Sequence, residues 1–153
     1  MFGIGEKTVD QSPEELAGFW TDAFGVSIDP ELLQEIDSWK IDRHGNFILR
    51  MQGGKKLFVG DKKVGQDGEL RPVVQKQGGG IRFDARDAYH MMLAHRSLGH
   101  TTISLYTGTK NKKALMWAAA NLLGINVDGY RPDGRALEYL DQMRSIQRRR
   151  QEK

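Results

Sequence analysis

The sequence contains no cysteine, so it offers no disulfide framework, no thiol nucleophile and no cysteine-ligated zinc site. It also lacks an apolar run of about eighteen residues, which excludes a membrane-spanning helix. The first fifteen residues show no basic region followed by an apolar one, as a secretory signal would. We therefore expect a cytoplasmic protein without a membrane span.

The formal net charge of +3 is small, but the charges are unevenly distributed. Residues 1–45 carry 3 Lys/Arg and 10 Asp/Glu, whereas residues 46–153 carry 20 and 10. Either the acidic segment folds over the basic one, or a basic face binds a polyanion. With 153 residues, 39% hydrophobic and 28% charged, the chain has the composition of one globular domain with a small appendage.

The first 45 residues are expected to form an acidic pair of helices. Ser12-Pro13-Glu14-Glu15 predicts an N-cap and a capping box, and an apolar stripe from Leu16 to Ala23 follows and stops at Gly25. A second helix is expected from Asp29-Pro30 to Trp39. The aromatic residues of this pair are predicted to be core.

Residues 46–76 have the pattern of a small antiparallel meander. Short β-prone runs lie at 47–49, 57–59 and 70–75, and glycine- and aspartate-containing turns separate them. Pro72 has no N–H group for a ladder, so we expect it at an edge or a bulge.

Strands and helices alternate from residue 81 onward. Strands are expected at 81–83, 102–106 and 125–127, with helices from the N-caps Asp84 and Thr109 to Leu98 and Leu123. This predicts a β-α-β-α-β unit with a parallel sheet, and a last helix follows Pro132-Asp133. The expected class is α+β, divided into an acidic helical subdomain (1–45), an α/β domain (46–132) and a basic C-terminal helix (133–153).

Catalytic chemistry finds little support in the sequence. His90, His95 and His100 are five residues apart, which turns successive side chains about 140° around a helix, so they do not form a zinc-binding helix pair. His95 is predicted to be partly buried and hydrogen-bonded. Asp84 and Asp87 fit the stabilisation of a helix start. We assign no catalytic residue, no metal ligand and no cofactor.

Two kinds of anion binding are predicted as alternatives to simple capping and solvation. The strand-to-helix junction formed by Thr107, Gly108, Thr109 and Lys110 is a candidate phosphate site, although Thr109 also fits a plain helix cap. A candidate nucleic-acid surface comprises Lys110, Lys112, Lys113, Arg144, Arg148, Arg149 and Arg150. The other explanation for these cations is that they only solvate helix surfaces or suit a helix C-terminus.

The last helix carries an apolar stripe that is a candidate docking surface for a protein partner. Its members are Leu137, Leu140, Met143 and Ile146. The same spacing is also typical of internal packing, so both explanations stay open at this point.

One stretch resembles a known family. Residues 80–132 contain GIRFDARDAYHMMLAHRSLG, then TISLYTGT, then KALMWAAANLLGINVDGYRP with its G-Y-x-P turn. This pattern is similar to the large polyvalent protein-associated domains, of the type appended to relaxases and other conjugative-plasmid mobility proteins, and the similarity extends over about 47–132. The resemblance implies a non-enzymatic accessory protein of conjugation, type IV secretion or a related mobile element. Its expected partners are a protein of such a complex and, as a further candidate, DNA or RNA. The alternative function is a component or effector that binds a phosphate-bearing ligand at residues 106–110.

Overall fold

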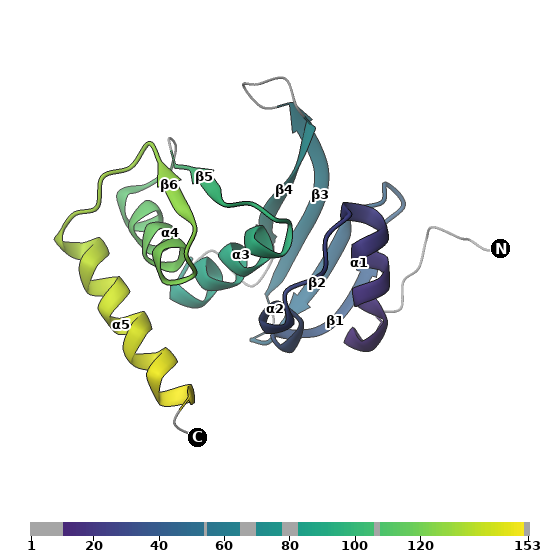
Figure 1. The fold of residues 1–153 in the computed structure, drawn as a ribbon, viewed down its shortest axis with the longest axis horizontal. Coiled ribbons are helices and arrows are strands. Elements are labelled where there is room, and N and C mark those ends of the chain that lie inside the picture. The colour runs from purple at the N-terminus through teal and green to yellow at the C-terminus, as the bar shows by residue number, and fades with distance from the viewer. Residues whose placement is uncertain (1–10, 54, 65–69, 78–82, 106–107, 152–153) are drawn as a thin grey trace. The chain divides into compact units, whose positions relative to one another are not determined.

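The structure is a computed structural model, and it divides the chain into two compact units, Met1–Ile81 and Arg82–Lys153 (Figure 1). It describes residues 11–53, 55–64, 70–77, 83–105 and 108–151. Helices and strands are mixed, and the strands of the first unit are antiparallel, which confirms the α+β class. The division lies between residues 81 and 82 and not at the predicted positions 45 and 132.

The first helix begins with a short 3₁₀ turn, Pro13–Glu15, and continues as α1, Leu16–Phe24. Gly25 ends it in the left-handed region, as the sequence predicts. Ser12 occupies the N-cap position and Pro13 follows it, as predicted, but the Ser12 side chain makes no cap hydrogen bond, so the predicted capping box is not formed. The carbonyl oxygen of Ser12 instead accepts a hydrogen bond of 2.6 Å from Nε1 of Trp39.

The second predicted helix is only partly correct. Asp29 caps α2, Pro30–Gln34, but this helix stops after five residues. The chain then enters strand β1, Ile36–Ile41, where a helix was expected to continue to Trp39. Pairing with strand β2, Phe47–Met51, outweighs the helical spacing because it places Trp39 opposite Leu49, and both side chains are fully buried.

A four-stranded antiparallel sheet follows the order β1-β2-β3-β4 and confirms the predicted meander. Its last two strands are β3, Lys56–Val64, and β4, Leu70–Gln77. The predicted boundary at residue 45 falls in the turn between β1 and β2, so residues 1–45 form no separate subdomain. Pro72 lies in β4, an edge strand, as expected.

Aromatic side chains join α1 to the sheet. Trp20 lies 5.5 Å from Phe47 and Phe19 lies 5.3 Å from Trp39, measured between ring centroids. Phe24 completes the cluster against Trp20 and Phe47. Tilted and edge-on aromatic pairs of this kind add to the stabilisation from burial. The prediction that the aromatic residues are core is confirmed for Trp20 and Trp39, which are fully buried, but it is wrong for Phe19, which is 46% exposed.

The second unit begins with helix α3, Ala85–Ser97. Asp84 and Asp87 form a reciprocal capping box at its start, which confirms the predicted cap. Strand β5, Thr102–Ser104, helix α4, Lys110–Leu122, and strand β6, Asn126–Asp128, form a parallel β-α-β arrangement as predicted. The expected strand at 81–83 is not formed at Phe83, and residues 81 and 82 lie outside the described residues.

The last helix, α5, runs from Gly134 to Gln151 and packs along α4 (Figure 1). Small residues on α4, among them Ala114, Ala118 and Ala119, are almost fully buried and allow its neighbours to approach closely. Because α5 belongs to the same compact unit, the predicted boundary at 132 is not a unit boundary. None of the helices in the described part of the chain is apolar enough over a sufficient length to cross a membrane.

Candidate nucleic-acid interface

The start of α4 lies where the first of the two parallel strands of the second unit has ended. Thr109 is its N-cap, and its Oγ1 atom accepts a hydrogen bond of 3.2 Å from the backbone N–H of Lys112. Its carbonyl oxygen accepts from the N–H of Lys113 at 3.0 Å. The predicted phosphate site is therefore explained at Thr109 by ordinary helix capping, while Thr107 lies outside the described residues.

A polar contact joins the starts of α4 and α5. Oδ1 of Asn111 accepts hydrogen bonds from the Tyr139 hydroxyl and, at 3.5 Å, from Nη1 of Arg135. At the start of α5, Oδ1 of Asp133 accepts a hydrogen bond of 3.0 Å from the N–H of Ala136. Both helices thus begin at the carboxyl end of β5 and β6, where parallel sheets usually place their ligands.

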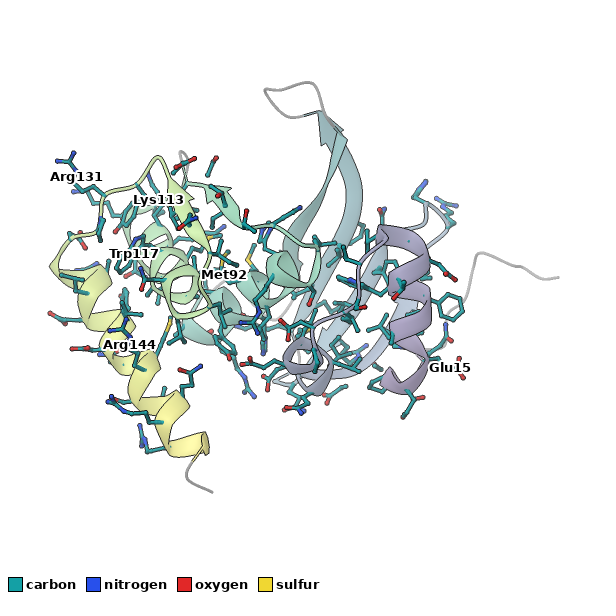
Figure 2. The ribbon with its side chains drawn as sticks, viewed as in Figure 1. Glu15, Met92, Lys113, Trp117, Arg131 and Arg144 are labelled. Atoms are coloured by element: carbon teal, nitrogen blue, oxygen red, sulfur yellow. The ribbon has the colours of Figure 1, made fainter. Side chains whose placement is uncertain are left out.

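Cations gather at this end of the unit. We define the cationic end as Lys110, Lys112, Lys113, Arg131 and Arg135, all of them exposed except Lys113, which is half-buried. Figure 2 labels Lys113, at the start of α4, and Arg131, in the loop that leads into α5.

Little in the described structure neutralises these charges. Within the described residues no carboxylate lies in ion-pair range of the three lysines. Nζ of Lys112 lies 5.1 Å from the centre of the Phe83 ring, so this lysine makes a cation–π contact instead. The whole second unit carries 13 Lys/Arg and 7 Asp/Glu, a net charge of +6, while the first unit has 10 and 13, a net of −3.

The predicted nucleic-acid surface is spread over two places. Arg144, Arg148 and Arg149 are exposed on α5, whereas the side chain of Arg150 lies outside the described part. Tyr139 contacts Asn111 at the start of α4 through its hydroxyl. Because an α-helix rises about 1.5 Å per residue, Arg148 lies about 13 Å farther along the axis of α5 than Tyr139. The lysines and the α5 arginines therefore do not form one compact cluster (Figure 2).

Two members of the cationic end, Arg131 and Arg135, are not among the residues predicted from the sequence. Arg131 lies three residues after the end of strand β6, in the segment that leads to α5. Arg135 stands four residues before Tyr139, so these two side chains face the same side of α5, toward Asn111, and for Arg135 this spacing was the available signal. Tyr130 also lies here; burial and, to a lesser extent, Asp133 raise the pKa of its hydroxyl.

The predicted partner-binding stripe on α5 is divided by burial. Leu140 and Met143 are 5% and 6% exposed and belong to the core of the unit. Leu137 and Ile146 are 54% and 46% exposed. Nine residues separate this exposed pair, which places them on opposite sides of the buried stripe, so the four residues do not form one docking face.

Two of the three predicted histidines meet at the end of α3. Nδ1 of His95 lies 2.9 Å from Nδ1 of His100, and His95 is half-buried, which confirms the prediction for His95. Burial and, to a lesser extent, the nearby His100 imidazole lower the pKa of His95 from 6.5 to about 4, so this ring is neutral at neutral pH. His90 is almost fully buried in the same helix.

Comparison with known proteins gave no match to a family model, to a curated protein or to a solved structure. In the described part of the chain, no three histidine or carboxylate side chains come together as a metal site would require. The most distinctive arrangement that remains is the cationic end of the second unit.

Proposed function

We propose that the chain is a non-enzymatic accessory protein that binds nucleic acid through the cationic end of its second unit. The observation that carries this proposal is the gathering of five cations around the starts of two helices, with no carboxylate in ion-pair range of the three lysines among the described residues. Lys and Arg at such a place contact phosphates without reading the base sequence.

The geometry favours an extended anion over a small one. The five cations come from three places, namely the first turn of α4, the segment after β6 and the first turn of α5. The hydroxyl of Thr109 and the amide oxygen of Asn111 already hold partners of the protein itself. A chain of phosphates can reach several cations at once, and each contact releases condensed counterions.

The test is fluorescence anisotropy of the full chain with labelled single-stranded and double-stranded DNA over a series of salt concentrations. We expect measurable binding at low salt and a steep loss as salt rises. Each phosphate contact contributes about −0.9 to the slope of log K against log salt for duplex DNA. Neutralising Lys110, Lys112 and Lys113 together to Ala should weaken binding about tenfold or more and flatten that slope by roughly two to three.

Two variants serve as controls. Arg43→Ala removes an exposed cation from a turn in the first unit and should leave affinity unchanged. The triple variant of Arg144, Arg148 and Arg149 to Ala measures the share of the α5 arginines, which we expect to be smaller than that of the lysines. Absence of binding at low salt, or equal affinity of the lysine variant and the Arg43→Ala protein, would show that the proposal is wrong.

The biological setting that we propose is conjugation, type IV secretion or a related mobile element, and it rests on the resemblance of residues 80–132 alone. A protein partner from such a complex belongs to the same proposal. Co-purification of the tagged full chain from its source cells, with and without nuclease treatment, tests it. Partners retained after nuclease are bound by protein contacts, and recovery of no component of such a system would contradict the setting.

A further inference from the structure

The end of α3 brings two imidazole rings together by a specific backbone path. Leu98 caps the helix, and Gly99 follows with a φ of +83°, a conformation that glycine adopts without strain. The N–H of His100 then donates to the carbonyl oxygen of His95 at 3.0 Å. This reversal places the two ring centroids 5.2 Å apart and the two Nδ1 atoms 2.9 Å apart.

The separation of the Nδ1 atoms has a consequence for metal binding. Nitrogen–metal bonds of about 2.0–2.1 Å to both atoms would meet at an angle of about 90°, because the atoms are 2.9 Å apart. A tetrahedral ion needs its ligands about 3.3 Å apart at the same bond length. Adjacent corners of a square-planar or tetragonal ion fit the observed separation, and Cu²⁺ and Ni²⁺ prefer that geometry with imidazole ligands.

We propose that His95 and His100 form a two-imidazole chelate for Cu²⁺, with weaker binding of Ni²⁺, and that water completes the coordination. Cu²⁺ is preferred over Ni²⁺ and Zn²⁺ because it binds nitrogen ligands most tightly among these ions. The His95 and His100 rings now share one hydrogen bond through their Nδ1 atoms. Both must carry their proton on Nε2 when the metal binds, so the ring that donates in the pair changes its tautomer.

The C-terminal end of α3, where His95 lies, suits a bound cation. His95 belongs to the last turn of α3, where the helix dipole is negative. Arg96 is the nearest residue in the sequence whose positive charge would repel a metal ion, but its side chain leaves the helix about 100° away from that of His95. The proposal is independent of nucleic-acid binding, since none of its residues belongs to the cationic end.

Isothermal titration of the full chain with CuSO₄, after treatment with EDTA and buffer exchange, tests the chelate. We expect one tight site in the wild-type protein and a loss of about a hundredfold in affinity for His100→Gln, because one remaining ring no longer benefits from the high effective concentration of the other. His44→Gln removes an exposed histidine from a turn in the first unit and should leave the site unchanged.

A spectroscopic readout tests the chelate without a substitution of His95, whose variant His95→Gln could fail to fold. Electron paramagnetic resonance of the Cu²⁺-loaded wild type should show two imidazole nitrogens, and His100→Gln should show one. Equal affinities of the wild type and His100→Gln, or a spectrum with fewer than two imidazole nitrogens, would overturn the proposal. NiCl₂ should compete with Cu²⁺ only at higher concentration, and equal affinities for Ni²⁺ and Cu²⁺ would count against this site.

Discussion

The side chain of Asn46 lies against the backbone of Gly60 and occupies the space that a larger residue would need. A Cβ atom added to Gly60 would lie 2.9 Å from Cγ and 3.1 Å from Cα of Asn46. The two residues are the next opposed pair beyond Phe47 and Val59 in the β2–β3 register. Asn46 is itself almost fully buried, and its position is fixed by hydrogen bonds to Asp42.

We predict that Gly60→Ala destabilises the first unit by about 2 kcal/mol or more. The new methyl group would overlap with Asn46, and the φ of +150° at this residue is strained for any side chain. Urea unfolding measures the change in the free energy of unfolding. Gly18→Ala in helix α1 is the matched control, since its Cβ would meet nothing within 4 Å and alanine favours a helix. A Gly60→Ala protein as stable as the wild type would contradict the packing described for Asn46.

Thr109→Ala should lower the stability of the second unit by about 1 kcal/mol. The substitution removes the hydroxyl that accepts from the N–H of Lys112 and leaves that group without its cap. Hydrogen exchange of the amides at the start of α4 measures the local effect. Thr109→Ser keeps a capping hydroxyl and should restore most of the protection. If Thr109→Ala exchanges like the wild type, the hydroxyl does not cap the helix in solution.

Leu140→Ala and Leu137→Ala should differ sharply although both remove the same atoms from the same helix. Leu140 is buried, so its truncation should cost about 2–5 kcal/mol, whereas Leu137 is exposed and should cost about 0.5 kcal/mol or less. Thermal unfolding followed by circular dichroism compares the two. Equal losses of stability would show that α5 packs on the unit in a different way.

The stability of the second unit should depend on pH through His95. The pKa of His95 is about 4 in the folded chain against 6.5 for an ordinary histidine, so the unfolded state binds more protons between these values. Above pH 6.5 the His95 ring is neutral in both the folded and the unfolded state, so stability does not change with pH through this residue. As the pH falls from 6.5 toward about 4, protonation of the unfolded state lowers the free energy of unfolding. A difference of one in pKa corresponds to about 1.4 kcal/mol, so the fall from 6.5 to about 4 sets an upper limit of about 3–4 kcal/mol.

Unfolding in urea at several pH values, with EDTA present, measures this dependence. The difference between wild type and His95→Gln isolates the histidine, because all carboxylates are shared by the two proteins. His44→Gln should follow the wild-type curve. Parallel curves for wild type and His95→Gln would show that His95 is not buried as a neutral ring.

Elements with a local chemical signal could be predicted from the sequence. Asp84 and Thr109 cap their helices because a short polar side chain can reach the first free N–H groups, and such a signal needs no knowledge of the rest of the fold. The segment after Gln34 could not be read in this way. Its apolar spacing fits a helix, and only pairing with β2 makes it a strand.

The sequence predicted that the candidate site is a cationic surface, but it did not predict all the residues that form it. Lys110, Lys112 and Lys113 are close in the sequence and were found together, while Arg131 and Arg135 join them only because α5 begins beside α4. Arg148 was grouped with the lysines by charge alone, and the length of α5 separates them. Packing between helices decides which cations lie together, and that packing depends on the pattern of buried residues, which the positions of the charges do not show.

The two edge strands of the sheet in the first unit, β1 and β4, differ in how their outer backbone groups are paired. Trp39 in β1 exchanges backbone hydrogen bonds with Gln11, whereas β4 has no further strand beside it among the described residues. An open strand is a template on which copies of a protein can stack during expression or storage. Pro72 interrupts the row of N–H donors within β4, so the residue that marked this strand as an edge also hinders uncontrolled edge-to-edge aggregation.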